Sequence, residues 1–409
     1  MLQGAQLRTF IASFLGWTLD AFDFFLVVVV VPHLAADFNT TVVNITVAIT
    51  LTLALRPIGA LIFGWFGDRY GRRIPLMVDI ALYSLIELLT AFSPNLTTFL
   101  ILRALFGIAM GGEWGLGAAL AMESLPANKR GLFSGILQEG YAVGNLLAGV
   151  VYGLFFTAIG WRGIFILGAL PALLILFIRA GVPESPVWEA GHAKRLELGG
   201  DVLWVSLKRY FPLFIYGMFF MATFNFMSHG TQDPYATFLI KQHGFDPHRV
   251  ALTNTIASIG AIVGGIFFGW LSQGFGRRRT IIVCAVLGAT MIPLWAFGQT
   301  LATLATGGFI MQFMVQGAWG IIPAHLNEIS PPLARGTFPG FAYQLGNLIA
   351  AGTFQIEAAL AASRFKLPNG AADYAHAMAI FMAFTFAAVI VLTLIGYLVR
   401  REGRHESFA

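Results

Sequence analysis

Long apolar runs, separated by short polar or charged segments, dominate the chain. Runs such as 43–66 and 375–399 reach or exceed the ~20 residues that an α-helix needs to cross a bilayer's hydrocarbon. Twelve runs follow one another: 10–32, 43–66, 75–93, 97–122, 132–157, 161–180, 211–239, 250–271, 279–299, 302–325, 337–362 and 374–400. This pattern predicts an all-α polytopic membrane protein with twelve transmembrane helices.

Composition agrees with a membrane location. Of the 409 residues, 57% are hydrophobic and 11% are charged, against roughly a quarter charged in a soluble domain. The single cysteine, Cys284, lies in the ninth run, so it excludes a disulfide framework and any cysteine-based metal site. We therefore predict no metal site and no cofactor.

The basic residues predict the orientation. If both termini are cytoplasmic, eighteen of the 25 Lys and Arg residues lie on the cytoplasmic side and five lie on the other. This satisfies the positive-inside rule, so the +5 charge indicates topology and not a nucleic-acid partner. We predict a multi-pass protein of the cytoplasmic membrane, monomeric, with both termini inside. The remaining two, Arg56 and Arg103, fall within spans and need another explanation.

The chain repeats itself with a shift of 205 residues. The segment 64–73 recurs at 269–278. The same shift relates Trp114 to Trp319, Glu123 to Glu328, and Arg130 to Arg335. A shift of half the length predicts two homologous six-helix bundles, at 1–180 and 211–409, joined by a cytoplasmic linker at 181–210.

Ionisable side chains inside the spans mark candidate functional positions. Each costs ~2.5–3.5 kcal/mol or more at the bilayer centre, so it usually faces a cavity or a partner. They are Asp20, Asp23, Arg56, Arg103, Glu113, Glu139, His229 and Asp233. We expect Glu113 and Glu139 either to line the cavity or to make polar contacts between helices, and Arg103 to pair with Asp23.

Arg56 is the candidate anion site. It lies twelve residues before Asp68, which places it roughly 18 Å from the cytoplasmic loop, near the bilayer midplane. A guanidinium matches the two oxygens of a carboxylate, so Arg56 is predicted to bind a small organic acid anion. The alternative is a permanent ion pair between Arg56 and Asp20, Asp23 or Glu139.

The seventh run carries the most informative polar pattern. Asn225, His229, Asp233 and Thr237 recur at every fourth position, which places them on one helical stripe facing an aqueous cavity. Pro234 predicts a break in this helix. We predict that His229 and Asp233 share the transported proton, with Asp20, Asp23 and Glu139 as further proton-coupling candidates. The alternative for His229 is a helix-packing role.

The loop at 64–73 matches the pattern G-x-x-x-D-R-x-G-R-[RK] and, with its repeat, resembles the major facilitator superfamily over essentially the whole chain. The resemblance implies the major facilitator fold and a cytoplasmic gate. The gate residues would be Asp68, Arg69, Arg72, Glu123, Arg130, Glu328 and Arg335, assisted by 183–186. The second copy has Gln273 and Gly274 where Asp and Arg stand in the first, so we expect its charge network to be weaker.

The stretch 225–237 matches N-x-x-[ST]-H-x-[ST]-Q-D-x-x-x-T, which resembles the seventh-helix signature of lactate and pyruvate permeases in the sialate:proton symporter family. The resemblance implies proton-coupled uptake of short monocarboxylates driven by the proton gradient. The predicted substrate-binding residues are Arg56, Asn225, His229, Gln232, Gln344 and Asn347.

Three alternatives stay open. The chain could move a different organic acid, such as sialate or an aromatic acid; it could export its substrate; or it could be a non-transporting membrane sensor. An enzyme is not expected, because the sequence has no P-loop, no H-E-x-x-H motif and no G-x-S-x-G elbow at a membrane face.

Overall fold

The computed structural model describes residues 2–191 and 202–399, and nearly all of them are helical. The first half contains α1 (Gly4–Asp37), α2 (Val42–Tyr70), α3 (Arg73–Ala91), α4 (Leu96–Met110), α5 (Glu113–Ser124), a 3-10 turn (Ala127–Lys129), α6 (Arg130–Gln138), α7 (Gly140–Leu167) and α8 (Ala172–Gly181). The second half contains α12 (Phe211–Gln232), α13 (Tyr235–His243), α14 (Pro247–Phe275), α15 (Arg277–Phe297), α16 (Leu301–Trp319), α17 (Ile322–Ile329), α18 (Phe338–Ala350), α19 (Thr353–Ser363) and α20 (Tyr374–Val399). Between the halves lie α9 (Pro186–Ala190) and α11 (Val202–Arg209), and part of the predicted linker, 192–201, lies outside the described residues.

Several predicted spans are formed by two successive helices. The fourth span is interrupted at Gly111 and Gly112, between α4 and α5. The seventh span is interrupted at Pro234, between α12 and α13, as predicted. Ten helical stretches of the described chain are long and apolar enough to cross a membrane. One of them, 127–181, contains two predicted spans on either side of Gly160, whose φ of 63° interrupts α7. The α16–α17 pair, which is not among the ten, covers the tenth predicted span.

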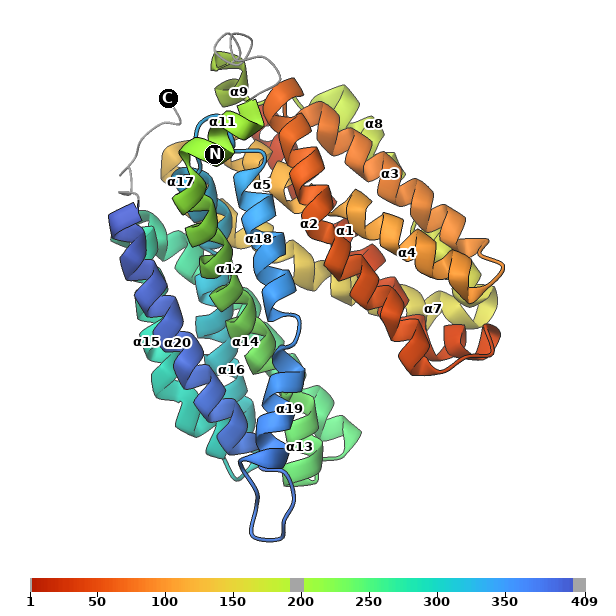
Figure 1. Ribbon diagram of the computed structural model, residues 1–409, viewed down its shortest axis with the longest axis vertical. Coiled ribbons are helices and arrows are strands. Elements are labelled where there is room, and N and C mark those ends of the chain that lie inside the picture. The colour runs from red at the N-terminus through yellow and green to blue at the C-terminus, as the bar shows by residue number, and fades with distance from the viewer. Residues whose placement is uncertain (1, 192–201, 400–409) are drawn as a thin grey trace.

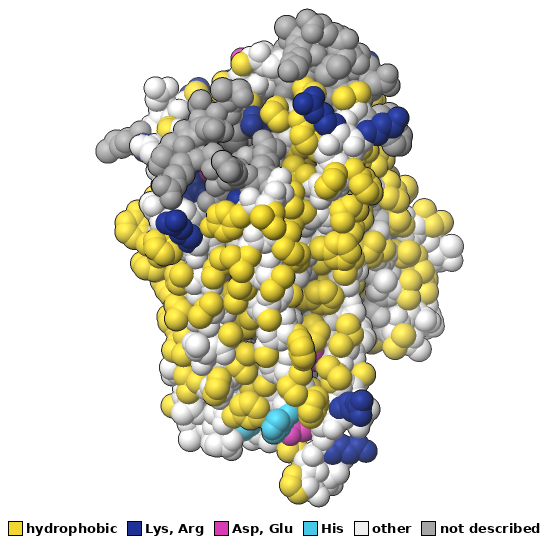
Figure 2. All heavy atoms as spheres, turned by 60° about the vertical axis from the view of Figure 1, so that its left-hand side comes forward, with side chains coloured by type: hydrophobic (Ala, Val, Ile, Leu, Met, Phe, Trp, Pro, Cys, Tyr) yellow, Lys and Arg dark blue, Asp and Glu magenta, His cyan; other side chains and the backbone are white. Residues whose placement is uncertain are grey.

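The two halves form separate bundles that meet at one end and diverge toward the other (Figure 1). The shared end holds the N-terminus, α9 and α11, and we call it the linker side; the opposite end, which holds α13 and α19, is the far side. The bundles contact each other through α2 with α18, α6 with α14, and α5 with α17 and α18. Hydrophobic side chains form a band over the face of the second bundle, with Lys and Arg gathered toward its two ends (Figure 2), as expected for a lipid-facing surface.

Glycines allow the bundles to touch backbone to backbone on the linker side. A Cβ atom on Gly64 would lie 2.9 Å from the carbonyl oxygen of Gly336, and one on Gly269 would lie 2.7 Å from the carbonyl oxygen of Gly131. These two contacts are related by the 205-residue repeat, because Gly64 corresponds to Gly269 and Gly131 to Gly336. Any larger side chain at these positions would push the bundles apart.

Candidate functional site

The first gate cluster consists of Asp68, Arg72 and Glu123 on the linker side. Arg72 contacts Asp68 Oδ1 at 2.8 Å and both oxygens of Glu123 at 3.1 and 3.2 Å. All three side chains are buried, with exposed fractions of 0–4%. Burial alone would lower the pKa of Arg72, but Glu123 and Asp68 outweigh it, so the pKa of this guanidinium is raised. The cluster is therefore a group of ion pairs shielded from solvent.

Asp68 also connects the two bundles. Its carboxylate accepts hydrogen bonds from the backbone N–H groups of Gly336 and Thr337, at 2.7 and 3.0 Å, and from the Thr337 hydroxyl at 2.7 Å. These donors lie at the start of α18, in the other half of the chain. The predicted gate residue Asp68 thus links the two bundles on the linker side.

The segment after α8 reinforces the first gate cluster. Ser185 donates a hydrogen bond to Glu123 at 2.5 Å, and Glu184 accepts the backbone N–H groups of Arg72 and Arg73 at 2.8 and 3.1 Å. Trp188 on α9 donates its indole N–H to the carbonyl oxygen of Asp68 at 2.9 Å. The stretch 183–186 therefore lies where the sequence predicts, beside the gate.

The second gate cluster, Gln273, Arg277 and Glu328, repeats this arrangement with a neutral amide. Arg277 contacts both oxygens of Glu328 at 2.8 and 3.1 Å. Gln273 accepts the backbone N–H of Gly131 at 3.0 Å and donates to the carbonyl oxygen of Ala127 at 2.8 Å. Gln273 thus joins the bundles at the repeat-related position of Asp68 without a charge of its own.

The other predicted gate residues have different surroundings. Arg130 donates from Nε to the Met122 carbonyl oxygen at 2.9 Å, and Arg335 is buried with 5% of its surface exposed. Arg69 is half-buried and lies over the rings of Trp65 and Tyr70, outside the contacts that link Asp68 to Glu123. Ser134 adds a contact that the sequence did not suggest: its hydroxyl donates to the Gly320 carbonyl and accepts the N–H of Ala324.

Aromatic side chains from both bundles pack together between the gate helices. Tyr343 on α18 contacts Trp114 at 4.7 Å and Trp319 at 5.7 Å between ring centroids, and it also contacts Trp17 at 6.4 Å. Tyr141 stacks on Trp17 at 5.5 Å. Trp114 and Trp319 are repeat-related, so each bundle contributes an equivalent ring to the same tyrosine. This aromatic cluster was missed from the sequence, where each ring reads as ordinary helix packing.

Arg56 on α2 forms an ion pair with Asp20 on α1, with 3.0 Å between Nη2 and Oδ2. Both side chains are almost fully buried, at 3% and 1% exposed. The pairing that the sequence left open thus exists in this state. Arg56 Nε and Asp20 Oδ1 make no hydrogen bond to any described residue, so each group has an unused polar atom.

Of the predicted polar stripe of the seventh span, His229 and Asp233 are accessible to solvent, whereas Asn225 is buried. His229 Nδ1 lies 3.0 Å from Asp233 Oδ2, and its Nε2 lies 3.3 Å from Asn347 Oδ1 on α18. The His229 and Asp233 side chains are 36% and 43% exposed, whereas the gate clusters are largely buried. The predicted pair therefore forms, and Asn347 joins it from a different span.

The remaining predicted substrate residues are more scattered. Gln232 contacts Ser228 at 3.3 Å and Gln312 at 3.0 Å, and it is exposed. Asn225 donates to the Met221 carbonyl oxygen of its own helix at 2.8 Å. Gln344 is buried, at 1% exposed, and neither atom of its amide bonds to a described residue. Glu139, which was predicted as a proton-coupling residue and not as a substrate ligand, is buried against Gly265 of the second bundle.

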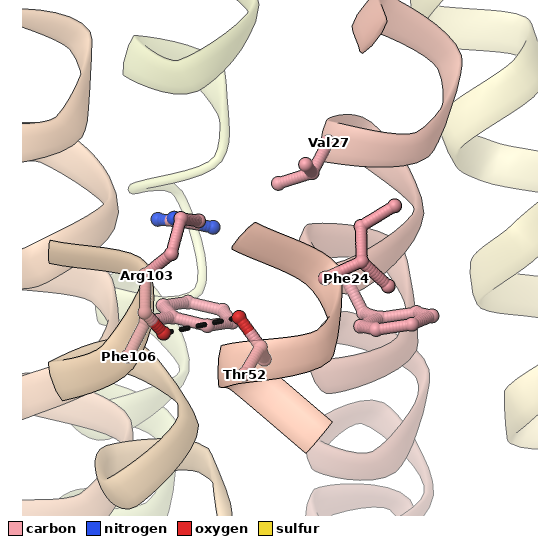
Figure 3. A pocket seen from close by; sticks show the side chains of 6 residues that line it. Phe24, Val27, Thr52, Arg103 and Phe106 are labelled. Carbon is pink, nitrogen blue, oxygen red and sulfur yellow. Dashed lines mark hydrogen bonds between the residues drawn. The ribbon is translucent and has the colours of Figure 1, made fainter. Parts of the chain in front are cut away.

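Arg103 has a different partner from the expected Asp23. Its Nη2 lies 2.5 Å from Glu87 and 2.8 Å from the Thr90 hydroxyl, both on α3. The guanidinium also lies over the ring of Phe106 at 4.2 Å. Figure 3 shows Arg103 and Phe106 beside a narrow crevice between α1, α2 and α4, where Thr52 donates to the Arg103 carbonyl oxygen at 3.0 Å. Arg103 thus links α4 to α3 through its side chain and to α2 through its carbonyl oxygen.

The family model for the Major Facilitator Superfamily matches the chain twice, over residues 13–231 and 218–408. The chain belongs to the major facilitator superfamily. The two matches correspond to the two repeats, and the twelve-span fold of two six-helix bundles predicted from the sequence is confirmed.

Individual relatives of this major facilitator protein are transporters, not enzymes. The "Carboxylic acid transporter protein homolog" of Saccharomyces cerevisiae is 34% identical over 415 aligned residues, covering 93% of this chain and 67% of the relative. The "Sialic acid transporter NanX" of Escherichia coli is 28% identical over 348 residues, covering 83% of this chain and 84% of the relative.

Among solved structures, the proton:xylose symporter XylE bound to 6-bromo-6-deoxy-D-glucose superposes with a TM-score of 0.76. The two sequences are 17% identical over 99% of this chain and 98% of the other, so this likeness shows the fold alone. In a major facilitator fold, side chains between the bundles can face one side of the membrane at a time. Here the two gate clusters lie where the bundles contact each other on the linker side, while His229 and Asp233 are accessible to solvent.

Proposed function

We propose that this protein is a proton-coupled symporter of short monocarboxylates of the lactate and pyruvate type, working by alternating access. Its linker side is cytoplasmic, as the distribution of Lys and Arg predicts, and it acts as a monomer in the cytoplasmic membrane. The observed state is then outward-facing. Names of the relatives support an organic acid as cargo, since one is a carboxylic acid transporter homolog and another a sialic acid transporter.

The observation that carries the proposal is the buried Arg56–Asp20 pair. A guanidinium inside a span needs an anionic partner, and Asp20 uses only Nη2. A substrate carboxylate can take the place of Asp20 and engage two nitrogens of the planar fork. The carboxylate of Asp20 is then left without its cation, and binding a proton removes that charge. Substrate anion and proton are therefore coupled at one ion pair.

A second pair supports proton coupling from the other bundle. His229 and Asp233 face the solvent-accessible space and are linked to Asn347. Both side chains change charge on binding a proton, so their pairing depends on pH and on which side of the membrane is open. We assign this pair, with Asn347 and Gln232, to the wall that receives the substrate.

Arg56→Lys tests the anion site. An ammonium keeps the charge but loses the two-pronged geometry, so we expect lactate binding to weaken by at least about tenfold while the protein still inserts and folds. Calorimetric binding to purified wild type and variant measures this, with Arg162→Lys, at a half-exposed surface ion pair with Asp37, as the control. Equal lactate affinity in wild type and Arg56→Lys would contradict the role of Arg56.

A further inference from the structure

Five carboxyl groups lie together inside the first bundle, on α1, α3 and α5. They are Asp20, Asp23, Asp79, Glu87 and Glu113, all 0–1% exposed, and we call them the acidic cluster. Two spans of the same bundle supply the cations Arg56 and Arg103. With every group charged, this part of the bundle would hold three more negative than positive charges in surroundings that disfavour any net charge.

The two arginines account for only two of the five carboxyls. Arg56 pairs with Asp20 and Arg103 with Glu87. Neither oxygen of Asp23 or Glu113 makes a hydrogen bond to a described residue, and Asp79 interacts with the backbone N–H of Gly112 but with no cationic side chain at ion-pair distance. These three acids therefore have capacity for protons that no ion pair in the described chain takes up.

A buried hydroxyl lies among these acids. Asp79, Tyr83 and Glu87 follow each other at every fourth position of α3, so they share one face of the helix. The Tyr83 hydroxyl is fully buried and has no hydrogen-bond partner among the described residues. It interacts electrostatically with Asp20, Asp23, Asp79 and Glu113. Tyr83 is thus a neutral donor and acceptor placed between acids of three helices.

The packing leaves room for the carboxyl groups themselves. A Cβ atom on Gly16 of α1 would overlap Glu113 Oε1, and one on Gly117 would lie 3.3 Å from the same oxygen. A Cβ atom on Gly112 would lie 3.0 Å from Asp79 Oδ1. Side chains larger than glycine at these positions would press on the acids. Glycine keeps the cluster's carboxyls within the helix interfaces.

The ligand that fits this cluster is a proton. No group of His, Cys, Asp and Glu side chains in the described part of the chain has an arrangement that could hold a metal ion. A proton neutralises a single carboxyl and needs no coordination shell. It can therefore be held by one acid at a time, although the acids stand on three different helices. The charged groups acting on Glu113 are Asp20 of α1, Arg56 of α2 and Asp79 of α3, and Tyr343 of α18 lies beside the neighbouring Trp114.

We propose that Asp79, Glu113 and Tyr83 form the proton-donating part of the coupling site and that they supply Asp20 when the substrate binds Arg56. This inference rests on the proposed function. As the substrate carboxylate displaces Asp20, the O–H bond of Glu113 breaks and an O–H bond forms on Asp20. The carboxylate left on Glu113 is then reprotonated through Asp79, which in turn takes up one proton from the far side. The proton gained offsets the charge of the bound anion, so the total charge of the first bundle with its substrate is unchanged and one proton accompanies one anion.

Glu113→Gln and Asp79→Asn test this directly, because each keeps the shape of the side chain and removes its proton. The first measurement is proton uptake on lactate binding, followed with a pH-sensitive dye in weakly buffered detergent solution. Wild type is expected to take up protons, and each variant to take up at least about threefold fewer while lactate binds within about tenfold of the wild-type affinity. Asp37→Asn, at the surface pair with Arg162, serves as the control for a carboxylate outside the cluster.

The second measurement is transport into proteoliposomes. We expect both variants to lose accumulation driven by a pH gradient while exchange of internal for external lactate continues. If either amide variant does not fold, Tyr83→Phe, which removes one hydroxyl, is expected to slow gradient-driven uptake with little change in exchange. Wild-type proton uptake in both Glu113→Gln and Asp79→Asn would overturn the inference, as would an unchanged rate of gradient-driven uptake in Tyr83→Phe. If wild type itself takes up no proton with lactate, the proposed function fails instead.

Discussion

The two gate clusters hold the same two bundles together with different chemistry. Asp68 and Gln273 occupy repeat-related positions, and each accepts a backbone N–H from the other bundle, Gly336 for Asp68 and Gly131 for Gln273. The first cluster is charged at its centre and buried, with Arg72 and Glu123 at 0% exposed. The second has a neutral amide at its centre, and its Glu328 is 22% exposed.

Both clusters share the backbone contacts between the bundles and an Arg–Glu ion pair, and they differ in the charge at the position of Asp68 and Gln273. Glycine contacts and a backbone N–H acceptor are present on both sides of the repeat. A buried carboxylate binds its donors more strongly than an amide does, but it loses more when a partner is removed. We infer that the first cluster determines how firmly the linker side closes, while the second mainly aligns the bundles.

The largest expected effect is that of Asp68→Asn. The amide loses the charge that holds Arg72 and Thr337, and it leaves Arg72 with fewer partners in a buried site. Linker-side opening should become easier by roughly 2–4 kcal/mol. The readout is the labelling rate of a cysteine introduced at Ala324 in a Cys284→Ala background. Ala324 is fully buried, and its backbone N–H donates to Ser134 of the other bundle.

Gln273→Ala is the matched comparison. It removes a neutral amide that accepts from Gly131 and Arg277 and donates to Ala127, while Arg277 keeps Glu328, so the shift should be about 1–2 kcal/mol. Labelling at position 324 should rise far less than in Asp68→Asn. Equal labelling rates in the two variants would break the comparison between the clusters.

A smaller effect separates the two glutamates. Glu123 is fully buried and shares Arg72 with Asp68, whereas Glu328 is partly exposed and pairs with Arg277. Water screens an exposed pair, so Glu328→Gln should cost less than about 1 kcal/mol, and Glu123→Gln should cost about twice that or more. Thermal unfolding in detergent measures both. A larger loss in Glu328→Gln would show that burial does not control the strength of the pair.

The smallest expected effect lies on the far side and gives a reference outside the gate. Burial by itself raises the pKa of Asp373. Hydrogen bonds from His376 and Gln242 lower this pKa by more than burial raises it, so the net pKa lies below the usual range. A lowered pKa stabilises the fold above the unfolded value, and this stability is lost as the pH falls through the folded value. Asp373→Asn should therefore reduce Tm slightly at pH 7 and not at a pH below that range. Labelling at position 324 should stay at the wild-type rate.

Apolar runs predicted the spans well because membrane length and polarity fix them locally. The repeat also pointed to residues that lie between the bundles, since equivalent residues of two similar bundles meet at their interface. Partner choice inside the first bundle was not predictable: Arg103 pairs with Glu87 and not with Asp23. That choice depends on which faces of α3 and α4 are turned toward each other. The sequence of either run does not determine this.

The acidic residues Asp79 and Glu87 were missed, although both stand within an apolar run. Asp79 and Glu87 are eight residues apart. They are recognised as one polar face of the helix only when Tyr83, midway between them, is counted as a polar residue. The aromatic cluster was missed for a different reason, because its rings come from five spans and meet only in the fold. In the seventh span the four-residue spacing was enough, since His229 and Asp233 are neighbours on one helix.

The most direct test of the account is uptake by purified protein in proteoliposomes under an imposed inward proton gradient. Labelled lactate, pyruvate, sialate and an aromatic acid are compared, with a proton ionophore as the control. The account predicts that lactate and pyruvate accumulate above their external concentration only while the gradient lasts. Accumulation of lactate that is unchanged by the ionophore, or accumulation of sialate or the aromatic acid with no uptake of lactate or pyruvate, would contradict it.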